Sequence, residues 1–250
     1  MTWVEKVKQT PSAALLFVQL AGVLLYPFME ATRPGRAAFS VFGVLVLALA
    51  VLAVRRTPSI TWVSAALAGP AVVLLVAQIF STASWLLPWS AAFEALLYFY
   101  AGVSLIRYMF ADHAVTTDEL FAVGATFTLF AWAFAYVYVV VQAMAPGSFT
   151  AAVNPDDPRS WVELLFLSFT TLSSTGLSDI VPIKPFARSV LMIEQLAGVL
   201  YVAMVVARIV GLTFARTGGG GSSDAPSYPG AAPVGSTATS PAAAEADDHS

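Results

Sequence analysis

The segment Ser168-Phe-Thr-Thr-Leu-Ser-Ser-Thr-Gly-Leu-Ser-Asp-Ile-Val-Pro182 (SFTTLSSTGLSDIVP) decides how this chain folds. It overlaps the end of a short apolar run, residues 161–172, and continues as a polar sequence containing Gly176. The run begins with Ser160 and Glu163 at the spacing of a capping box, in which each side chain bonds the backbone N–H group of the other residue. The pattern predicts a short helix with a defined start, followed by irregular chain.

The composition places this segment in a membrane protein. Of 250 residues, 58% are apolar and 11% are charged, against roughly 45–50% and about 25% in soluble domains. Cysteine is absent and the only histidines are His113 and His249, which excludes disulfides, thiolate metal sites and a histidine metal cluster. The net charge of −3 lacks the basic character of a nucleic-acid-binding protein. A soluble enzyme and a nucleic-acid partner are both disfavoured.

Six apolar runs outside this segment are long enough to cross a hydrocarbon core of about 30 Å, which takes roughly 20 helical residues. They cover residues 12–29, 37–54, 60–80, 86–110, 120–145 and 186–214. The first run is interpreted as a span rather than a signal peptide, because no small-residue cleavage site precedes Glu30. We expect an all-α membrane protein with six transmembrane helices.

The run at residues 161–172 is too short to cross, since its helix would be only about 18 Å long at 1.5 Å per residue. Lipid offers no hydrogen-bond partners, so the non-helical chain that follows must be shielded by protein or line water. A re-entrant half-helix that returns as extended chain meets this requirement. The alternative is a helix lying flat at the membrane interface.

The spans divide the chain into an N-terminal segment (1–11), a four-helix peripheral domain (12–115), a domain that contains the re-entrant segment (116–216) and a C-terminal tail (217–250). The tail is rich in Gly, Ser, Pro and Ala, so we expect it to be disordered and to form no cytoplasmic ligand-binding domain. Seven of the 12 Lys and Arg residues fall on the N-terminal side of the membrane. This distribution favours a plasma-membrane protein whose N and C termini both lie in the cytoplasm.

The re-entrant segment has the chemistry of a cation path. Its helix ends near Leu172, and the carbonyl end of a helix dipole stabilises a cation. Extended chain over residues 174–178 would present carbonyl oxygens about 3 Å apart, and a ring of such strands replaces the hydration shell of an ion. Asp179 would add one negative charge per subunit at the outer mouth. Because the segment occurs once per chain, closing the ring requires a homo-oligomer.

The sequence Thr171-Leu-Ser-Ser-Thr-Gly-Leu-Ser-Asp179 resembles the pore motif of the potassium-channel superfamily, T-x-x-T-x-G-[YFL]-G-D. The last span, residues 187–208, is similar to the inner helix of bacterial six-span members, with Gly198 at the position of their hinge glycine. The resemblance covers about a quarter of the chain. It implies a homotetrameric pore-loop channel with a selectivity filter and no cofactor other than permeant potassium or another monovalent cation.

The resemblance also implies roles for individual residues. Potassium would be coordinated by backbone oxygens of Ser174, Thr175, Gly176 and Leu177, and Ser178 would complete the filter. The residues packing behind the filter would be Thr170 and Thr171. The residues lining an inner cavity would be Val199, Val202 and Val206.

Two filter positions depart from the family pattern. Leu177 replaces the usual aromatic residue, and Ser178 replaces the second glycine. In the family that glycine has a conformation which costs other L-residues roughly 1–2 kcal/mol, so strain is expected at Ser178. Ion passage is compatible with this strain, whereas strict selectivity for potassium is less compatible with it.

Ionisable residues within spans are functional candidates. The fourth span offers only Arg107, so a voltage sensor, which needs several basic residues at three-residue spacing, is not expected. Glu94 and Arg208 are interpreted as paired structural charges or as side chains reaching the interface. His113 is interpreted as part of a solvated loop, with pH sensing as the alternative.

Glu194 lies in the last span, opposite the predicted pore helix. One interpretation is a filter support bonded to pore-helix hydroxyls such as Ser168 or Thr171. The other is a structural hydrogen bond between helices.

These features favour a passive cation channel that conducts potassium or other monovalent cations through residues 174–178 of four subunits and catalyses no reaction. The alternative is a pore-fold membrane protein that does not conduct and has a sensing or regulatory role. A membrane enzyme or a transporter is disfavoured, because the sequence shows neither clustered acid, base or metal-ligand residues nor internal repeats.

Overall fold

The structure is a computed structural model. It describes residues 11–30, residues 42–52 except 44 and 47, residues 61–111 except 82 and 84, and residues 117–218. Four predictions concern residues that lie wholly or mainly outside this description: the N-terminal segment 1–11, the ends of the span at 37–54, His113 and the tail 217–250.

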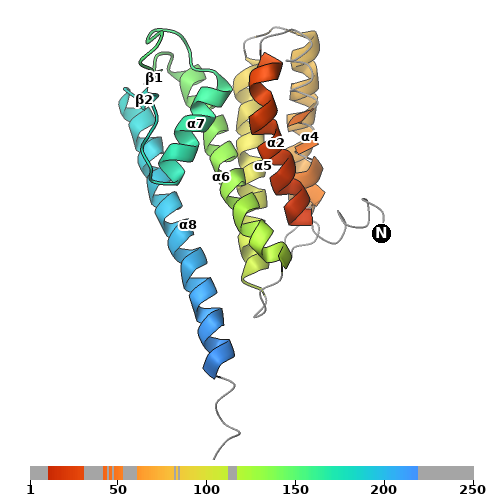
Figure 1. The fold of residues 1–250 in the computed structure, drawn as a ribbon. Helices are drawn as coiled ribbons and strands as arrows, with labels where there is room; N and C mark the ends of the chain where they lie inside the picture. The colour runs from red at the N-terminus through yellow and green to blue at the C-terminus, as the bar shows by residue number, and fades with distance from the viewer. Residues whose placement is uncertain are drawn as a thin grey trace, which may run out of the picture. The chain divides into compact units, whose positions relative to one another are not determined.

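The described chain is mostly helical, as predicted (Figure 1). The long helices are α2 (Pro11–Glu30), α4 (Thr61–Phe80), α5 (Leu86–Met109), α6 (Thr117–Met144) and α8 (Pro185–Gly218). Each begins and ends within four residues of the expected bounds. The described residues between 42 and 52 are also helical. Long apolar runs therefore located these helices correctly.

Three helices of the described chain are long and apolar enough to cross a membrane, over Leu86–Met109, Asp118–Met144 and Pro185–Gly211. The apolar parts of α2 and α4 are shorter, at Pro11–Tyr26 and Trp62–Gln78. The membrane-protein class is thus supported, whereas the full set of six spans and the tetramer stay predictions.

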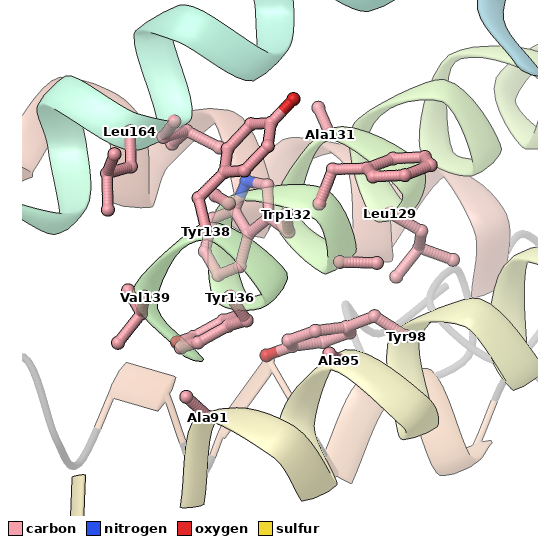
Figure 2. Close-up of a cluster of buried hydrophobic side chains, with 14 of the residues drawn as sticks. Ala91, Ala95, Tyr98, Leu129, Ala131, Trp132, Tyr136, Tyr138, Val139 and Leu164 are labelled. Carbon is pink, nitrogen blue, oxygen red and sulfur yellow. The ribbon is translucent and has the colours of Figure 1, made fainter. Parts of the chain in front are cut away.

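Helix α5 packs along both α4 and α6, and α2 packs on α6. Figure 2 shows the centre of this packing, where Tyr98 of α5 stacks on Tyr136 of α6 with ring centroids 5.7 Å apart. Tyr98 also meets Trp132 edge-on at 5.9 Å. Trp132 in turn contacts Trp161 at 5.0 Å. Because Trp161 is the first residue of α7 (Trp161–Leu172), this aromatic chain joins α5, α6 and the short helix.

Helix α7 has the predicted bounds and the predicted capping box. Ser160 donates its backbone N–H to Glu163 Oε2 at 2.6 Å, and the Glu163 N–H reaches Ser160 Oγ at 3.4 Å. The helix packs against α6, and most of its residues from Leu164 to Leu172 are buried. A short helix with a fixed start is therefore embedded among the long ones.

A small sheet that the sequence did not predict holds the chain on either side of α7. Strand β1 (Phe149–Thr150) pairs antiparallel with β2 (Val181–Pro182). The Ile183 N–H extends the pairing by donating to the Ser148 carbonyl oxygen at 2.9 Å. The segment that leaves the loop after α7 is thereby tied to the chain that follows α6.

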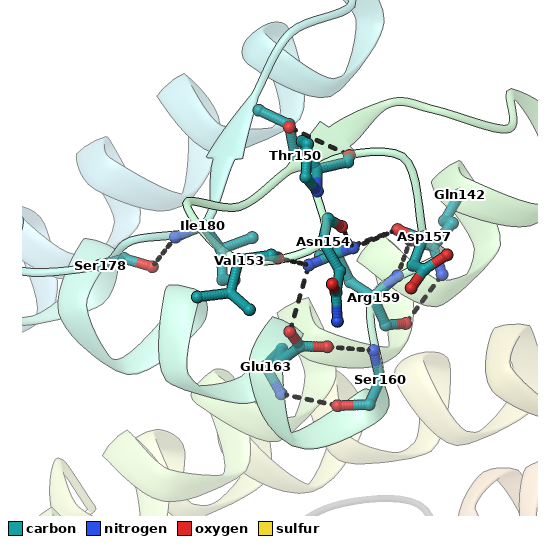
Figure 3. Close-up of polar contacts among 11 residues, drawn as sticks. Gln142, Thr150, Val153, Asn154, Asp157, Arg159, Ser160, Glu163, Ser178 and Ile180 are labelled. Carbon is teal, nitrogen blue, oxygen red and sulfur yellow. Dashed lines mark hydrogen bonds and ion pairs between the residues drawn. The ribbon is translucent and has the colours of Figure 1, made fainter.

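The loop between β1 and α7 is organised around Arg159, which is only 5% exposed (Figure 3). Its guanidinium donates to the carbonyl oxygens of Val153, Asn154 and Asp157 and to Glu163 Oε1. The side-chain amide of Gln142 in α6 bonds both backbone groups of Arg159. This network fixes the position at which α7 starts.

We expect Arg159→Lys to lower the free energy of unfolding by about 1–3 kcal/mol, because one ammonium group cannot reach all the carbonyl oxygens that the guanidinium bonds. Thermal unfolding of the purified protein in detergent measures this. Arg188→Lys is the control, since exposed Arg188 donates one hydrogen bond, to Pro182. Equal melting temperatures for the two variants would contradict the role given to Arg159.

Candidate functional site: the loop at the end of the pore helix

The C-terminal end of α7 closes in a Schellman motif, a common way to end a helix. The Ser174 N–H donates to the Thr171 carbonyl oxygen at 3.0 Å, and the Thr175 N–H to that of Thr170 at 3.0 Å. The motif places one residue in the left-handed region, usually glycine. Here that residue is Ser174, with φ of 59°.

The Thr170 carbonyl oxygen gathers the polar groups of the loop. Besides the Thr175 N–H, it accepts the Gly176 N–H at 3.1 Å, the Thr175 hydroxyl at 3.2 Å and the Ser173 hydroxyl at 3.4 Å. Thr170 and Thr171 are themselves 7% and 6% exposed. The first residues of the loop are thus anchored through their donors to the last turn of a buried helix.

The carbonyl oxygens of the loop have no such partners. None of the described residues donates a hydrogen bond to the carbonyl oxygens of Ser174, Thr175, Gly176 or Leu177. Residues 173–177 are exposed on the single chain, Leu177 by 78%, and Asp179 is exposed as well. The loop therefore bonds its backbone donors inward and leaves a series of acceptors open.

Two expectations about the loop backbone are wrong. The chain is not uniformly extended, because Ser174 and Gly176 (φ of 64°) are both left-handed. Ser178 has no positive φ, so the expected strain at Ser178 is absent. Its hydroxyl instead accepts the Ile180 N–H at 3.0 Å, as serine does in turns. The left-handed serine is Ser174, because the helix end requires that conformation there.

Glu194 of α8 joins three helices. It is fully buried and accepts hydrogen bonds from the hydroxyls of Ser168 in α7 and Tyr138 in α6. The Ser168 hydroxyl oxygen also lies 2.8 Å from the Ala131 carbonyl oxygen of α6, which is a second acceptor for its single proton. The expected contact with Ser168 is present. Tyr138 was not predicted, because nothing in the sequence pairs one tyrosine of an aromatic-rich helix with a carboxyl 56 residues away.

Gly198 of α8 lies directly against the end of the pore helix. A Cβ atom at this position would be 2.1 Å from the Leu172 carbonyl oxygen, far inside van der Waals contact. The absence of a side chain is therefore what lets α8 approach the residue at which α7 ends. This packing role is independent of the hinge role that the resemblance implies.

We expect Gly198→Ala to destabilise the protein by about 1–3 kcal/mol, because the added methyl group forces α8 away from backbone atoms. Thermal unfolding in detergent measures the change. Gly211→Ala is the matched control on the same helix, since no atom lies within 4 Å of the Cβ it would add. A helical glycine costs about 0.5–1 kcal/mol relative to alanine, so this variant should be neutral or slightly more stable. A fully stable Gly198→Ala would contradict the close approach.

The rest of α8 is poorly covered by its own chain. Only 17% of its apolar stretch is buried, against 61% for α6. The three residues predicted to line a cavity, Val199, Val202 and Val206, are 55%, 49% and 54% exposed. Their spacing of three and four residues places them on one helix face. That face is free for contact with water, lipid or further subunits.

The two remaining intramembrane charges behave differently. Arg208 forms an ion pair with Glu119 at 3.3 Å and lies 5.0 Å from the centre of the Phe110 ring, so its interpretation as a paired charge is confirmed. Glu94 is 2% exposed and forms no ion pair with any described residue. Within the described part of the chain, Glu94 is therefore buried without the ion-pair partner that one of its two interpretations expects.

Helices α6 and α8, the short buried helix α7 and the loop with open carbonyl oxygens occupy one continuous region of the chain. Residues 124–215 match the family model described as "Ion channel". This match spans α7, the loop and most of α6 and α8. Over these residues the chain is similar to that family of ion channels, and the match supports the resemblance to the potassium-channel superfamily. No curated protein and no solved structure matches the chain.

Proposed function

We propose that four copies of this chain form a passive channel for potassium or other monovalent cations in the plasma membrane. Residues 174–178 of each copy form the selectivity filter. Both termini lie in the cytoplasm, and the helices before α6 form a peripheral domain with α5. No reaction is catalysed.

The observation that supports this function most directly is the division of hydrogen bonds in the loop. The donors of Ser174, Thr175 and Gly176 bond back to the last turn of α7, whereas no described residue bonds their carbonyl oxygens. Backbone acceptors in a membrane require partners. A dehydrated cation surrounded by oxygens from several chains provides them.

The local conformation suits this role. In an extended strand, successive side chains and carbonyl groups point to opposite sides. Left-handed residues at alternate positions, Ser174 and Gly176, turn the peptide planes and favour oxygens on a common side. The carbonyl end of α7 lies immediately behind them and adds a negative electrostatic potential.

The assembly follows from what one chain leaves uncovered. The exposed valine face formed by Val199, Val202 and Val206 would line the cavity below the filter. Asp179 would contribute a ring of four carboxylates at the outer mouth. Leu177 and Ser178, which replace the aromatic residue and the second glycine of the family pattern, favour modest discrimination between potassium and other monovalent cations.

We expect the purified protein in liposomes to pass potassium or thallium, and Gly176→Ala to reduce this flux at least several-fold. Alanine at a φ of 64° is strained by roughly 1–2 kcal/mol in each subunit. Gly147→Ala is a matched control outside the pore, because Gly147 has φ of 74° and, like Gly176, an open surrounding. This variant should keep the flux of the parent.

The reversal potential under a potassium/sodium gradient then measures selectivity. Equal flux in the two glycine variants would contradict the filter assignment. A stable tetramer that does not leak would support the alternative of a non-conducting, regulatory pore-fold protein. A monomer in detergent and in lipid would contradict the assembly.

A further inference from the structure

A cavity lies among helices α2, α4, α5 and α6, apart from the loop after α7. Its volume is about 360 Å³, within the range of small-molecule sites. Its walls come from α2, α4, α5 and α6, and it reaches the start of α7 at Ser160 and Trp161. The resemblance to channels assigns no role to this cavity.

Glu94 of α5 is the central polar group of the cavity wall. The residue is 2% exposed, and its Oε2 atom has no hydrogen-bond partner among the described residues. Burying a carboxyl oxygen without a hydrogen-bond partner is unfavourable. A ligand that donates a hydrogen bond to Glu94 Oε2 would remove this cost.

The described residues that line the cavity provide no free positive charge for Glu94. Arg159 is the one basic residue in its lining, and its guanidinium is bonded to three loop carbonyl oxygens and to Glu163. Gln142 is likewise occupied by the backbone of Arg159. Among the described lining residues, the Glu94 Oε2 atom therefore has no donor, although the Tyr136 hydroxyl bonds the carboxyl group.

A second acceptor lies in the same wall. Gln78 of α4 donates through Nε2 to Ser90 Oγ at 2.6 Å, which fixes its side chain. Its Oε1 atom accepts no hydrogen bond from the described residues. Ser90 precedes Glu94 by one helical turn on α5, so Gln78 is held on the same side of that helix. The cavity thus offers acceptors from two helices.

Aromatic rings form another part of the lining. Trp161 has its ring 5.7 Å from that of Tyr26 and 5.6 Å from that of Tyr136. All three residues line the cavity, and the Tyr136 hydroxyl interacts with the Glu94 carboxyl group. Faces of aromatic rings attract cations, above all organic ones. One carboxyl group beside aromatic rings is poorly suited to Ca²⁺ or Mg²⁺, which need several oxygen ligands.

We propose that this cavity binds a small organic cation of the guanidinium or ammonium class. The cation bonds Glu94 Oε2 and Gln78 Oε1 and packs against Tyr26, Tyr136 and Trp161. Since Trp161 is the first residue of the pore helix, the bound cation touches the element that holds the loop. The binding site itself is independent of whether the channel conducts.

Methylguanidinium is a suitable probe, and N-methylurea is its uncharged isostere. We expect saturation-transfer NMR on the full-length protein in detergent to detect methylguanidinium binding and to detect little binding of N-methylurea. Equal binding of both compounds, or no binding of either, would overturn the proposal.

Glu94→Gln should weaken methylguanidinium binding at least tenfold while keeping the shape of the side chain. Asp156→Asn is the matched control, because it removes a negative charge from the exposed loop before α7, outside the cavity. It should bind like the parent.

Tyr26→Leu, in helix α2, should weaken methylguanidinium binding several-fold. It serves as the second variant if Glu94→Gln does not fold. Parental affinity in a folded Glu94→Gln variant, or in Tyr26→Leu where that variant alone folds, would overturn the proposal. Flux is not part of this measurement, so its result is separate from that for the pore.

Discussion

Two of the three backbone donors at the start of the loop after α7 bond one carbonyl group, that of Thr170. Inside a membrane, irregular backbone persists only if its N–H groups find partners, and the Thr170 carbonyl oxygen supplies them to Thr175 and Gly176. Thr170 lies in the last turn of a helix whose start is fixed by a capping box and by the Arg159 network. The loop is therefore positioned from both ends of α7, and its open carbonyl oxygens are a consequence of where its donors are bonded.

Helix α8 is held to this unit at a few specific points rather than by extensive packing. Glu194 connects it to α6 and α7 through Tyr138 and Ser168, and Gly198 allows contact with the Leu172 carbonyl group. The short polar anchor near the middle of the pore domain leaves most of the apolar surface of α8 uncovered. Such an apolar surface suits a helix that contacts lipid or further helices.

Sequence patterns predicted the features that depend on neighbouring residues. Long apolar runs located the described helices, and the spacing of Ser160 and Glu163 gave the start of α7. Features that depend on distant contacts were missed, such as the two-residue strands β1 and β2 and the bond from Tyr138 to Glu194. The roles of the filter residues rest on the family pattern, because carbonyl directions are not encoded in side-chain order.

The position of the left-handed residues shows why a motif alone misplaces backbone strain. Alignment with the family pattern directs attention to Ser178, where a glycine is missing. The structure instead has its left-handed serine at Ser174, because a Schellman closure needs that conformation one residue after the cap. Ser178 is two residues beyond Gly176, where the chain has left the helix end and its hydroxyl bonds Ile180. Helix termination therefore sets the backbone conformation of Ser174, at the start of the loop. At position 178, near the end of the loop, the backbone has no such requirement and serine fits without strain.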